Sequence, residues 1–214
     1  MLIIFDLDGT IIESGKGIVK SFEYSLTKMG LEVPNVKELE KFIGPPLEDT
    51  FRNSLGFAEQ EADKALAFYR EHYAKNGKSM NKIYAGVEET IKELSKEHVL
   101  AVGTSKLEES ARDIIKYFDL EKYFAFVGGA AMDGSRNTKA KVLKYVLENI
   151  GEYDSEETYM IGDRFYDIKG AKELNLKSIG VKWGYGEEKE LIDAGADYIV
   201  NNTDELKELV KRIK

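Results

Sequence analysis

After residue 80, short apolar runs alternate with amphipathic stretches, and this alternation restricts the fold of the chain more than any other feature. The runs are nearly continuous in apolar residues, which is typical of strands buried on both faces of a parallel sheet. The stretches between them repeat apolar residues every three or four positions, as helices do. The LIIF segment at residues 2–5 would add one more strand. The later runs lie at 99–103, 124–128, 158–162, 178–181 and 197–200, and the helical stretches at 107–118, 138–149 and 187–194.

Residues 15–83 show a different pattern. Apolar residues recur at spacings of three and four from Ile18 and Phe22 onward, and the segment contains no convincing strand. We therefore expect an α/β core with a doubly wound, mostly parallel sheet, built from residues 1–14 and 84–214. An all-helical domain at 15–83 would be inserted into that core.

Composition excludes several classes of protein. The absence of cysteine removes disulfides, thiolate metal sites and a cysteine nucleophile. The net charge of −8 argues against a nucleic acid as the main partner, although a local cation could still admit a small phosphorylated substrate. No stretch approaches the roughly 18 apolar residues of a membrane span, and the short apolar start lacks the features of a signal peptide. We expect a cytoplasmic globular protein without a membrane partner, either a monomer or a homodimer.

Acidic and hydroxyl side chains follow three of the predicted strands. Because ligands of open parallel sheets bind outside the carboxyl ends of the strands, we expect these side chains to share one edge. Gly9 would let the chain turn sharply away after the first strand. The side chains are Asp6 and Asp8 after residues 2–5, Thr104 and Ser105 after 99–103, and Asp163 and Asp167 after 158–162.

Carboxylates from separate strands would repel one another unless a cation joined them. Oxygen ligands without His or Cys suit Mg²⁺. A nucleophilic carboxylate beside Mg²⁺, with a hydroxyl and an ammonium nearby, is suited to phosphoryl transfer. Lys139, near the positive end of the helix predicted at 138–149, could supply the ammonium. Lys106, Arg136 and Lys141 are nearby alternatives.

Four sequence motifs resemble, in their usual order, those of the haloacid dehalogenase (HAD) superfamily. They are the D-x-D-x-T segment at 6–10, Thr104, Lys139, and the G-D-x₃-D segment at 162–167. The helical insert is similar to the small helical cap of that superfamily. Three segments further resemble its phosphoglycolate phosphatase-like branch: DLDGTIIES at 6–14, IGPPLEDTF at 43–51 and the tail at 180–200.

The resemblance implies a role for each acidic residue. Asp6 would be the nucleophile that forms an aspartyl-phosphate, and as a free Asp with a pKa near 3.9 it would be ionised without an activating base. Asp8 would act first as general acid and then as general base, with a raised pKa, and its backbone carbonyl would ligate Mg²⁺. Asp163 would complete the set of metal ligands with Asp6 and Asp8. Asp167 would ligate the cation through water or orient Asp163 and Lys139. Its residue type also suits the N-cap of the next helix, and both roles can hold together.

The phosphoryl group would be bound by residues of the other motifs. Thr104 would donate a hydrogen bond to a phosphoryl oxygen, and the regions of Ser105 and Gly9 would add amide donors. Lys139 would neutralise the charge of Asp6 and of the phosphoryl group. The resemblance thus implies Thr104 and Lys139 as catalytic residues beside Asp6 and Asp8.

Substrate choice would fall to the helical cap. Gly44 and Pro45 resemble part of the specificity loop of the family, and Arg52 is either an anion clamp or a surface residue. The leading interpretation is a Mg²⁺-dependent phosphatase of a small phosphomonoester, with 2-phosphoglycolate and a nucleoside monophosphate as candidates. The alternatives are a phosphomutase similar to β-phosphoglucomutase, which Thr10 disfavours, and a phospho-accepting switch without catalysis.

Overall fold

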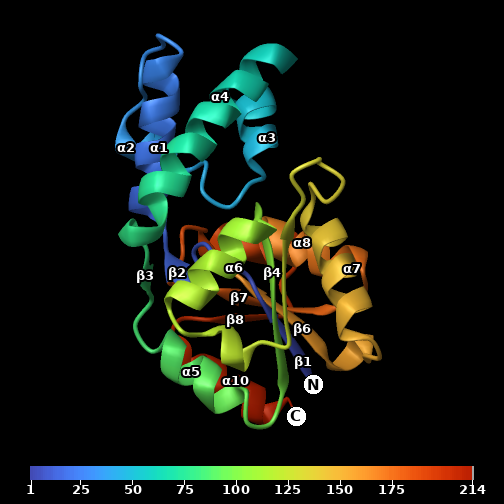
Figure 1. Ribbon diagram of the computed structural model, residues 1–214. Coiled ribbons are helices and arrows are strands. Elements are labelled where there is room, and N and C mark those ends of the chain that lie inside the picture. The colour runs from blue at the N-terminus through green and yellow to red at the C-terminus, as the bar shows by residue number, and fades with distance from the viewer. Residues whose placement is uncertain (214) are drawn as a thin grey trace. The chain divides into compact units, whose positions relative to one another are not determined.

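The computed structural model describes residues 1–213, and the chain divides into two compact units (Figure 1). Unit 1 consists of Met1–Ile12 and the chain from Ile83 onward, and unit 2 is Glu13–Lys82. None of the helices within residues 1–213 combines the length and the apolar content that crossing a bilayer requires.

Unit 1 is built on a six-stranded parallel sheet with the order β5-β4-β1-β6-β7-β8. The first strand lies in the middle, paired on one side with β4 and on the other with β6, and all four of its residues are buried. This topology confirms the predicted doubly wound α/β fold. The strands are β1 (Leu2–Phe5), β4 (Val99–Leu107), β5 (Phe126–Ala130), β6 (Thr158–Gly162), β7 (Lys177–Val181) and β8 (Tyr198–Val200).

Helices cover both faces of this sheet. Figure 1 shows α7 and α8 on one side and α5, α6 and α10 on the other. Leu143 of α7 packs with Ile4 of β1 and Met160 of β6 in a cluster of fully buried apolar side chains. The helices are α5 (Val87–Leu94), α6 (Glu108–Tyr117), α7 (Lys139–Ile150), α8 (Phe165–Glu173), α9 (Glu188–Ala194) and α10 (Thr203–Arg212), with short 3₁₀ turns at Glu121–Tyr123 and Ser155–Glu157.

Unit 2 is formed by helices around an aromatic core. Phe22, Phe51 and Tyr69 are buried, and the ring of Phe22 lies 5.4 Å from that of Phe51 and 4.9 Å from that of Tyr69. The Phe22–Tyr69 pair meets edge to face, a geometry that adds to the gain from burying the apolar area. The elements are α1 (Gly15–Lys28), α2 (Val36–Glu40), α3 (Leu47–Asp49), α4 (Glu59–His72), π-helical turns at Thr50–Ser54 and Tyr73–Gly77, and a 3₁₀ turn at Lys78–Met80.

Two details of the predicted strands were wrong. The segment 15–83 contains one short strand, β3 (Lys82–Ile83), which pairs with β2 (Ile12–Glu13) in a separate two-stranded sheet. The strand expected at 99–103 continues to Leu107, with a register shift between Gly103 and Leu107 in its pairing with β5. Such an irregularity redirects the side chains of the strand, here those of residues 104–106.

Candidate active site

The chain turns sharply where β1 ends. The backbone N–H of Asp6 still pairs with the Ile161 carbonyl of β6 at 2.8 Å, so Asp6 continues the sheet by one residue. Gly9 then adopts a φ of 84°, and a Cβ at this position would overlap the carboxylate of Asp163. Only glycine therefore lets the backbone of this turn approach the end of β6 so closely.

Four buried carboxylates lie at the ends of β1 and β6, and we call them the acid cluster: Asp6, Asp8, Asp163 and Asp167. Oxygen atoms of Asp6, Asp163 and Asp167 lie within 4.8 Å of one another. The expected meeting of these side chains at one edge of the sheet is therefore observed. Such proximity is unfavourable without compensating positive charge.

Lys139 lies inside the acid cluster. Its Nζ is 2.9 Å from Asp6 Oδ1 and 2.7 Å from Asp167 Oδ1, and it donates to the Gly103 carbonyl at 3.1 Å. Burial alone would lower the pKa of Lys139, but the charges of Asp167 and Asp6 outweigh it and raise the pKa. Thr138 caps α7 by accepting a hydrogen bond from an amide of the first turn, so the helix begins at Lys139 and presents it to the cluster.

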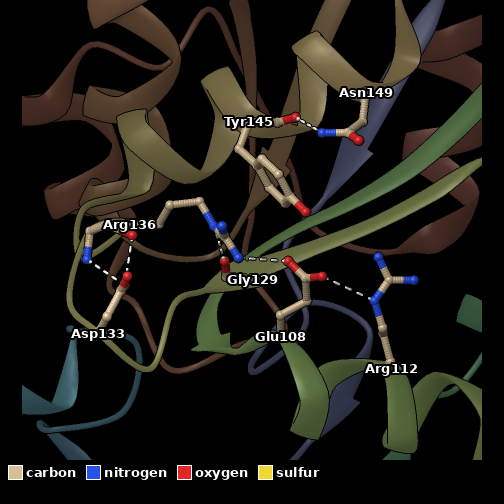
Figure 2. A network of polar contacts seen from close by, with 8 residues as sticks. Glu108, Arg112, Gly129, Asp133, Arg136, Tyr145 and Asn149 are labelled. Atoms are coloured by element: carbon tan, nitrogen blue, oxygen red, sulfur yellow. Dashed lines mark hydrogen bonds and ion pairs between the residues drawn. The ribbon is translucent and has the colours of Figure 1, made fainter.

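Two of the other basic candidates, Lys141 and Arg136, lie elsewhere. Lys141 Nζ contacts Asn137 at the surface. Arg136 donates from Nε to the Gly129 carbonyl and from Nη2 to Glu108, and its guanidinium lies 3.8 Å from the ring centroid of Tyr145 (Figure 2). Neither residue is therefore placed to neutralise Asp6 in the way that Lys139 is.

Lys106 pairs with Asp8, a contact that the sequence did not predict. Its Nζ lies 2.9 Å from Asp8 Oδ2, and both side chains are largely buried. The signal for this contact in the sequence is the position of Lys106 two residues after Thr104, because side chains two positions apart on a strand point to the same face. The backbone N–H of Lys106 also donates to Thr104 Oγ1. The Thr104 hydroxyl and the Lys106 ammonium therefore come from the same short stretch of β4.

Asp163 is held through both of its oxygens. Oδ1 accepts from the Thr10 hydroxyl at 3.2 Å, and Oδ2 accepts from the Tyr185 backbone N–H at 2.8 Å. Neither partner was predicted from the sequence. Two donors on one carboxylate fix its orientation toward the cluster.

Asp167 is not the N-cap of α8, one of the roles that the sequence suggests for it. The N-cap is Arg164, and Asp167 is the third residue of the helix, where its Oδ2 accepts from the Arg164 backbone N–H at 3.0 Å. Its Oδ1 contacts Lys139. Asp167 therefore closes the helix terminus and orients Lys139 at the same time.

Burial and crowding hold protons on the acid cluster. Burial, followed by the charges of Asp167 and Asp6, raises the pKa of Asp163 to about 8. Burial raises the pKa of Asp6 to about 6 against the opposing effect of Lys139, whereas the sequence suggested an ordinary value. The cluster thus needs additional positive charge to become fully ionised at neutral pH.

The residues present fit a divalent cation. The four carboxyl groups form ion pairs with two ammonium groups, those of Lys106 and Lys139, so their full ionisation would leave an excess of two negative charges. In addition, Asp8 Oδ1 and Ser105 Oγ are buried and have no hydrogen-bond partner within residues 1–213. Carboxylate oxygens together with substrate oxygens form the kind of donor set that Mg²⁺ takes.

The residues expected to select the substrate lie in unit 2. Gly44 has a φ of 106° in the bend that precedes α3, and Pro45 follows it. Arg52 lies in the π-helical turn at Thr50–Ser54, with its Nη2 3.4 Å from Asp63 and 3.8 Å from Glu59. The charge of Arg52 is thus already shared with two exposed carboxylates, and its role as an anion clamp stays a prediction.

The fold and the site define a family. The chain belongs to the haloacid dehalogenase-like hydrolases, and the match to this family covers residues 3–181. The resemblance drawn from the motifs is thereby confirmed.

The chain is also similar to individual proteins. It is 37% identical to a 5'-nucleotidase of Pseudomonas aeruginosa over 190 residues, which is 88% of this chain and 86% of the relative. It is 37% identical to the tyrosine-protein kinase PtkA of Mycobacterium tuberculosis over 211 residues, 97% of this chain and 71% of that protein. The crystal structure of a predicted phosphatase from Clostridium acetobutylicum matches with a TM-score of 0.95 and 40% identity, covering 99% of this chain and 98% of the other.

Proposed function

We propose that the protein is a Mg²⁺-dependent phosphatase that hydrolyses a small phosphomonoester through an aspartyl-phosphate on Asp6. The observation that carries the proposal is the acid cluster: four buried carboxyl groups at adjacent strand ends, beside two ammonium groups, those of Lys106 and Lys139. Membership in a hydrolase family and similarity to a protein named 5'-nucleotidase support it.

Asp6, Asp163 and the backbone carbonyl of Asp8 would hold the cation. Mg²⁺, when bound there, would neutralise the excess charge and polarise the phosphoryl oxygens. Lys139, Thr104 and the amides near Ser105 would bind the same oxygens. Positioning and charge stabilisation of this kind account for most of the catalysis in phosphoryl transfer.

The reaction would proceed in two displacements at phosphorus. In the first, a carboxylate oxygen of Asp6 forms a bond to phosphorus while the ester oxygen leaves and takes a proton from Asp8. In the second, Asp8 accepts a proton from water as that water attacks phosphorus, and the bond to Asp6 breaks to release phosphate. Asp8 Oδ2 is paired with Lys106, so Oδ1 is the oxygen open for this proton transfer.

The substrate candidates are a nucleoside monophosphate and 2-phosphoglycolate. The first agrees with the name of the Pseudomonas relative, and the second with the motifs of the sequence. Gly44, Pro45 and Arg52 of unit 2 would select between them. A cytoplasmic location and a state of monomer or homodimer stay predictions.

The test is phosphate release from a panel of nucleoside monophosphates, sugar phosphates, 2-phosphoglycolate and an aryl phosphate, with Mg²⁺ and with EDTA. We expect turnover that requires Mg²⁺ and is lost in Asp6→Asn. Asp193→Asn is the matched control, because Asp193 is an exposed residue of α9 that pairs with Lys189. It should behave as wild type.

Two results would contradict the proposal. One is the absence of phosphate release from every substrate together with isomerisation of a sugar phosphate, which would favour the phosphomutase alternative. The other is transfer of phosphate from ATP to tyrosine without hydrolysis of any phosphomonoester, the activity that the name of the mycobacterial relative suggests.

A further inference from the structure

The loop between β7 and α9 contains the sequence Trp183-Gly184-Tyr185-Gly186, which we call the tryptophan loop. It lies in unit 1, as do the acid cluster and the turn after β1. The proposed mechanism assigns no role to its side chains. Its contacts nevertheless converge on one residue of the site.

Both oxygens of Asp163 are connected to this loop. The backbone N–H of Tyr185 donates directly to Oδ2 at 2.8 Å. On the other side, the indole Nε1 of Trp183 donates to the Thr10 carbonyl at 3.0 Å, and the Thr10 hydroxyl donates to Asp163 Oδ1 at 3.2 Å. The loop therefore holds one oxygen by itself and the other by way of Thr10.

The two glycines bring the loop into backbone contact with the site. A Cβ at Gly184 would overlap the Gly9 carbonyl and the Asp163 side chain, and a Cβ at Gly186 would overlap the Asp163 carbonyl. Two of these neighbours are backbone atoms, which cannot move aside as the end of a flexible side chain can. The sequence of the loop is thus constrained by its approach to Asp163.

The helix that follows the tryptophan loop is also anchored next to Asp163. Glu190, in the first turn of α9, accepts from Arg164 Nε at 2.8 Å and from the Phe165 backbone N–H at 3.1 Å. Both donors follow Asp163 directly in the chain. The tryptophan loop is therefore bonded to Asp163 itself, and the helix after the loop is bonded to the two residues that follow Asp163.

We propose that Trp183 and the Tyr185 amide are positioning elements that orient the Asp163 carboxylate, so that the tryptophan loop responds to a divalent cation bound there. This inference rests on the Mg²⁺ site of the proposed function. Groups that fix a ligand from behind raise metal affinity, because the ligand is ordered before the metal arrives. A cation that binds to the Asp163 carboxylate changes the hydrogen bonds that connect Asp163, by way of Thr10, to Trp183.

The chain carries its own reporter, since Trp183 is the single tryptophan. The full-length protein would be titrated with MgCl₂, without substrate, while tryptophan emission is recorded. Calorimetry in parallel would give the Mg²⁺ affinity. We expect a saturable change in emission with the midpoint that calorimetry gives, and neither signal in Asp163→Asn.

Variants separate positioning from folding. Trp183→Phe keeps an aromatic ring but removes the indole donor, and we expect Mg²⁺ to bind about 5-fold more weakly, the effect of losing one hydrogen bond. Gly184→Ala should weaken Mg²⁺ binding at least about 10-fold. Gly151→Ala is the control: its φ is 92° but a Cβ there meets nothing within 4 Å, so it should lower the melting temperature and leave Mg²⁺ affinity unchanged.

The outcomes distinguish this inference from the proposed function. Constant emission while calorimetry shows Mg²⁺ binding would overturn the inference alone, as would an unchanged Mg²⁺ affinity in Trp183→Phe. The absence of any Mg²⁺ binding would overturn both. Equal loss of affinity in Gly184→Ala and Gly151→Ala would reduce the tryptophan loop to a structural element and also contradict the inference.

Discussion

Two networks of charged side chains in unit 1 are unbalanced in opposite directions. In the acid cluster, buried carboxylates outnumber their ammonium partners. In the network of Figure 2, one carboxylate, Glu108, is shared by two guanidinium groups: Arg112 Nε lies 3.2 Å from Oε1 and Arg136 Nη2 lies 2.9 Å from Oε2. That network lines an open cavity of about 570 Å³, where water reaches its charges.

The difference lies in what each arrangement requires from outside the chain. Solvent screens the arginine network, so its imbalance costs little. In the acid cluster, burial makes the ionised carboxylates unfavourable, and for this reason the pKa values of Asp6 and Asp163 are raised. Positive charge from outside the chain would therefore ionise the acid cluster fully, whereas the arginine network needs no such charge.

The largest contrast is expected when one carboxylate is removed from each network. Asp6→Asn should reduce phosphate release at least about 10³-fold, because the nucleophile is lost. Glu108→Gln should retain turnover within about 2-fold. Steady-state assays on both variants measure the contrast. Comparable losses in the two would show that the acid cluster has no special role in catalysis.

Lys139→Met should give the next largest effect. It leaves the acid cluster with a further uncompensated negative charge, so turnover should fall about 10²-fold and the free energy of unfolding by about 3 kcal/mol. Lys141→Met, two residues along α7, removes only a surface contact with Asn137 and should be close to wild type. Chemical denaturation and phosphate assays check both values. A Lys139→Met variant as stable and active as wild type would refute the charge argument.

Metal-free stability should depend on pH through Asp163. Its pKa is raised from an ordinary 3.8 to about 8 in the folded chain, so the folded state binds the proton more tightly. The resulting stability is fully present below the ordinary pKa and is lost as pH rises through about 8. Melting temperatures in EDTA should therefore fall over this window by more in wild type than in Asp163→Asn. Mg²⁺ should restore wild type most strongly at the alkaline end, and a restoration independent of pH would contradict this assignment.

The smallest effect is expected in the arginine network itself. Arg136→Lys keeps the charge but loses the fork that joins Gly129 and Glu108, so the unfolding free energy should fall by about 1 kcal/mol or less. Differential scanning calorimetry in low and high salt checks it, and the difference should shrink in high salt. A loss of Mg²⁺ affinity in this variant would mean that the two networks are coupled.

Much of unit 1 and the centre of the site could be predicted from the sequence. Continuous apolar runs define parallel strands, and the polar residues at their ends must then meet, as Asp6 and Asp163 do. Lys139 was identified from its place at the start of a helix. These features are set locally, within a few residues of a strand or helix terminus.

What escaped prediction depends on residues far apart in the chain. The bond from Trp183 to Thr10 joins positions 173 residues apart, and the pairing of Lys106 with Asp8 depends on how an irregular strand directs its side chains. The raised pKa of Asp6 follows from complete burial, which the identity of a residue does not reveal. Asp167 suits an N-cap by residue type, but the N-cap of α8 lies three residues earlier, and Asp167 caps the Arg164 backbone N–H from the third helical position.

The central claim is that phosphate passes through a covalent bond to Asp6. The most direct test is to quench the reaction with acid during turnover, reduce it with borohydride and locate the modified residue by peptide mass spectrometry. An aspartyl-phosphate is reduced to homoserine, so the account predicts homoserine at position 6 in wild type with substrate and Mg²⁺, and none without substrate. Rapid phosphate release with position 6 unmodified at every quench time, or with the modification at another residue, would contradict it.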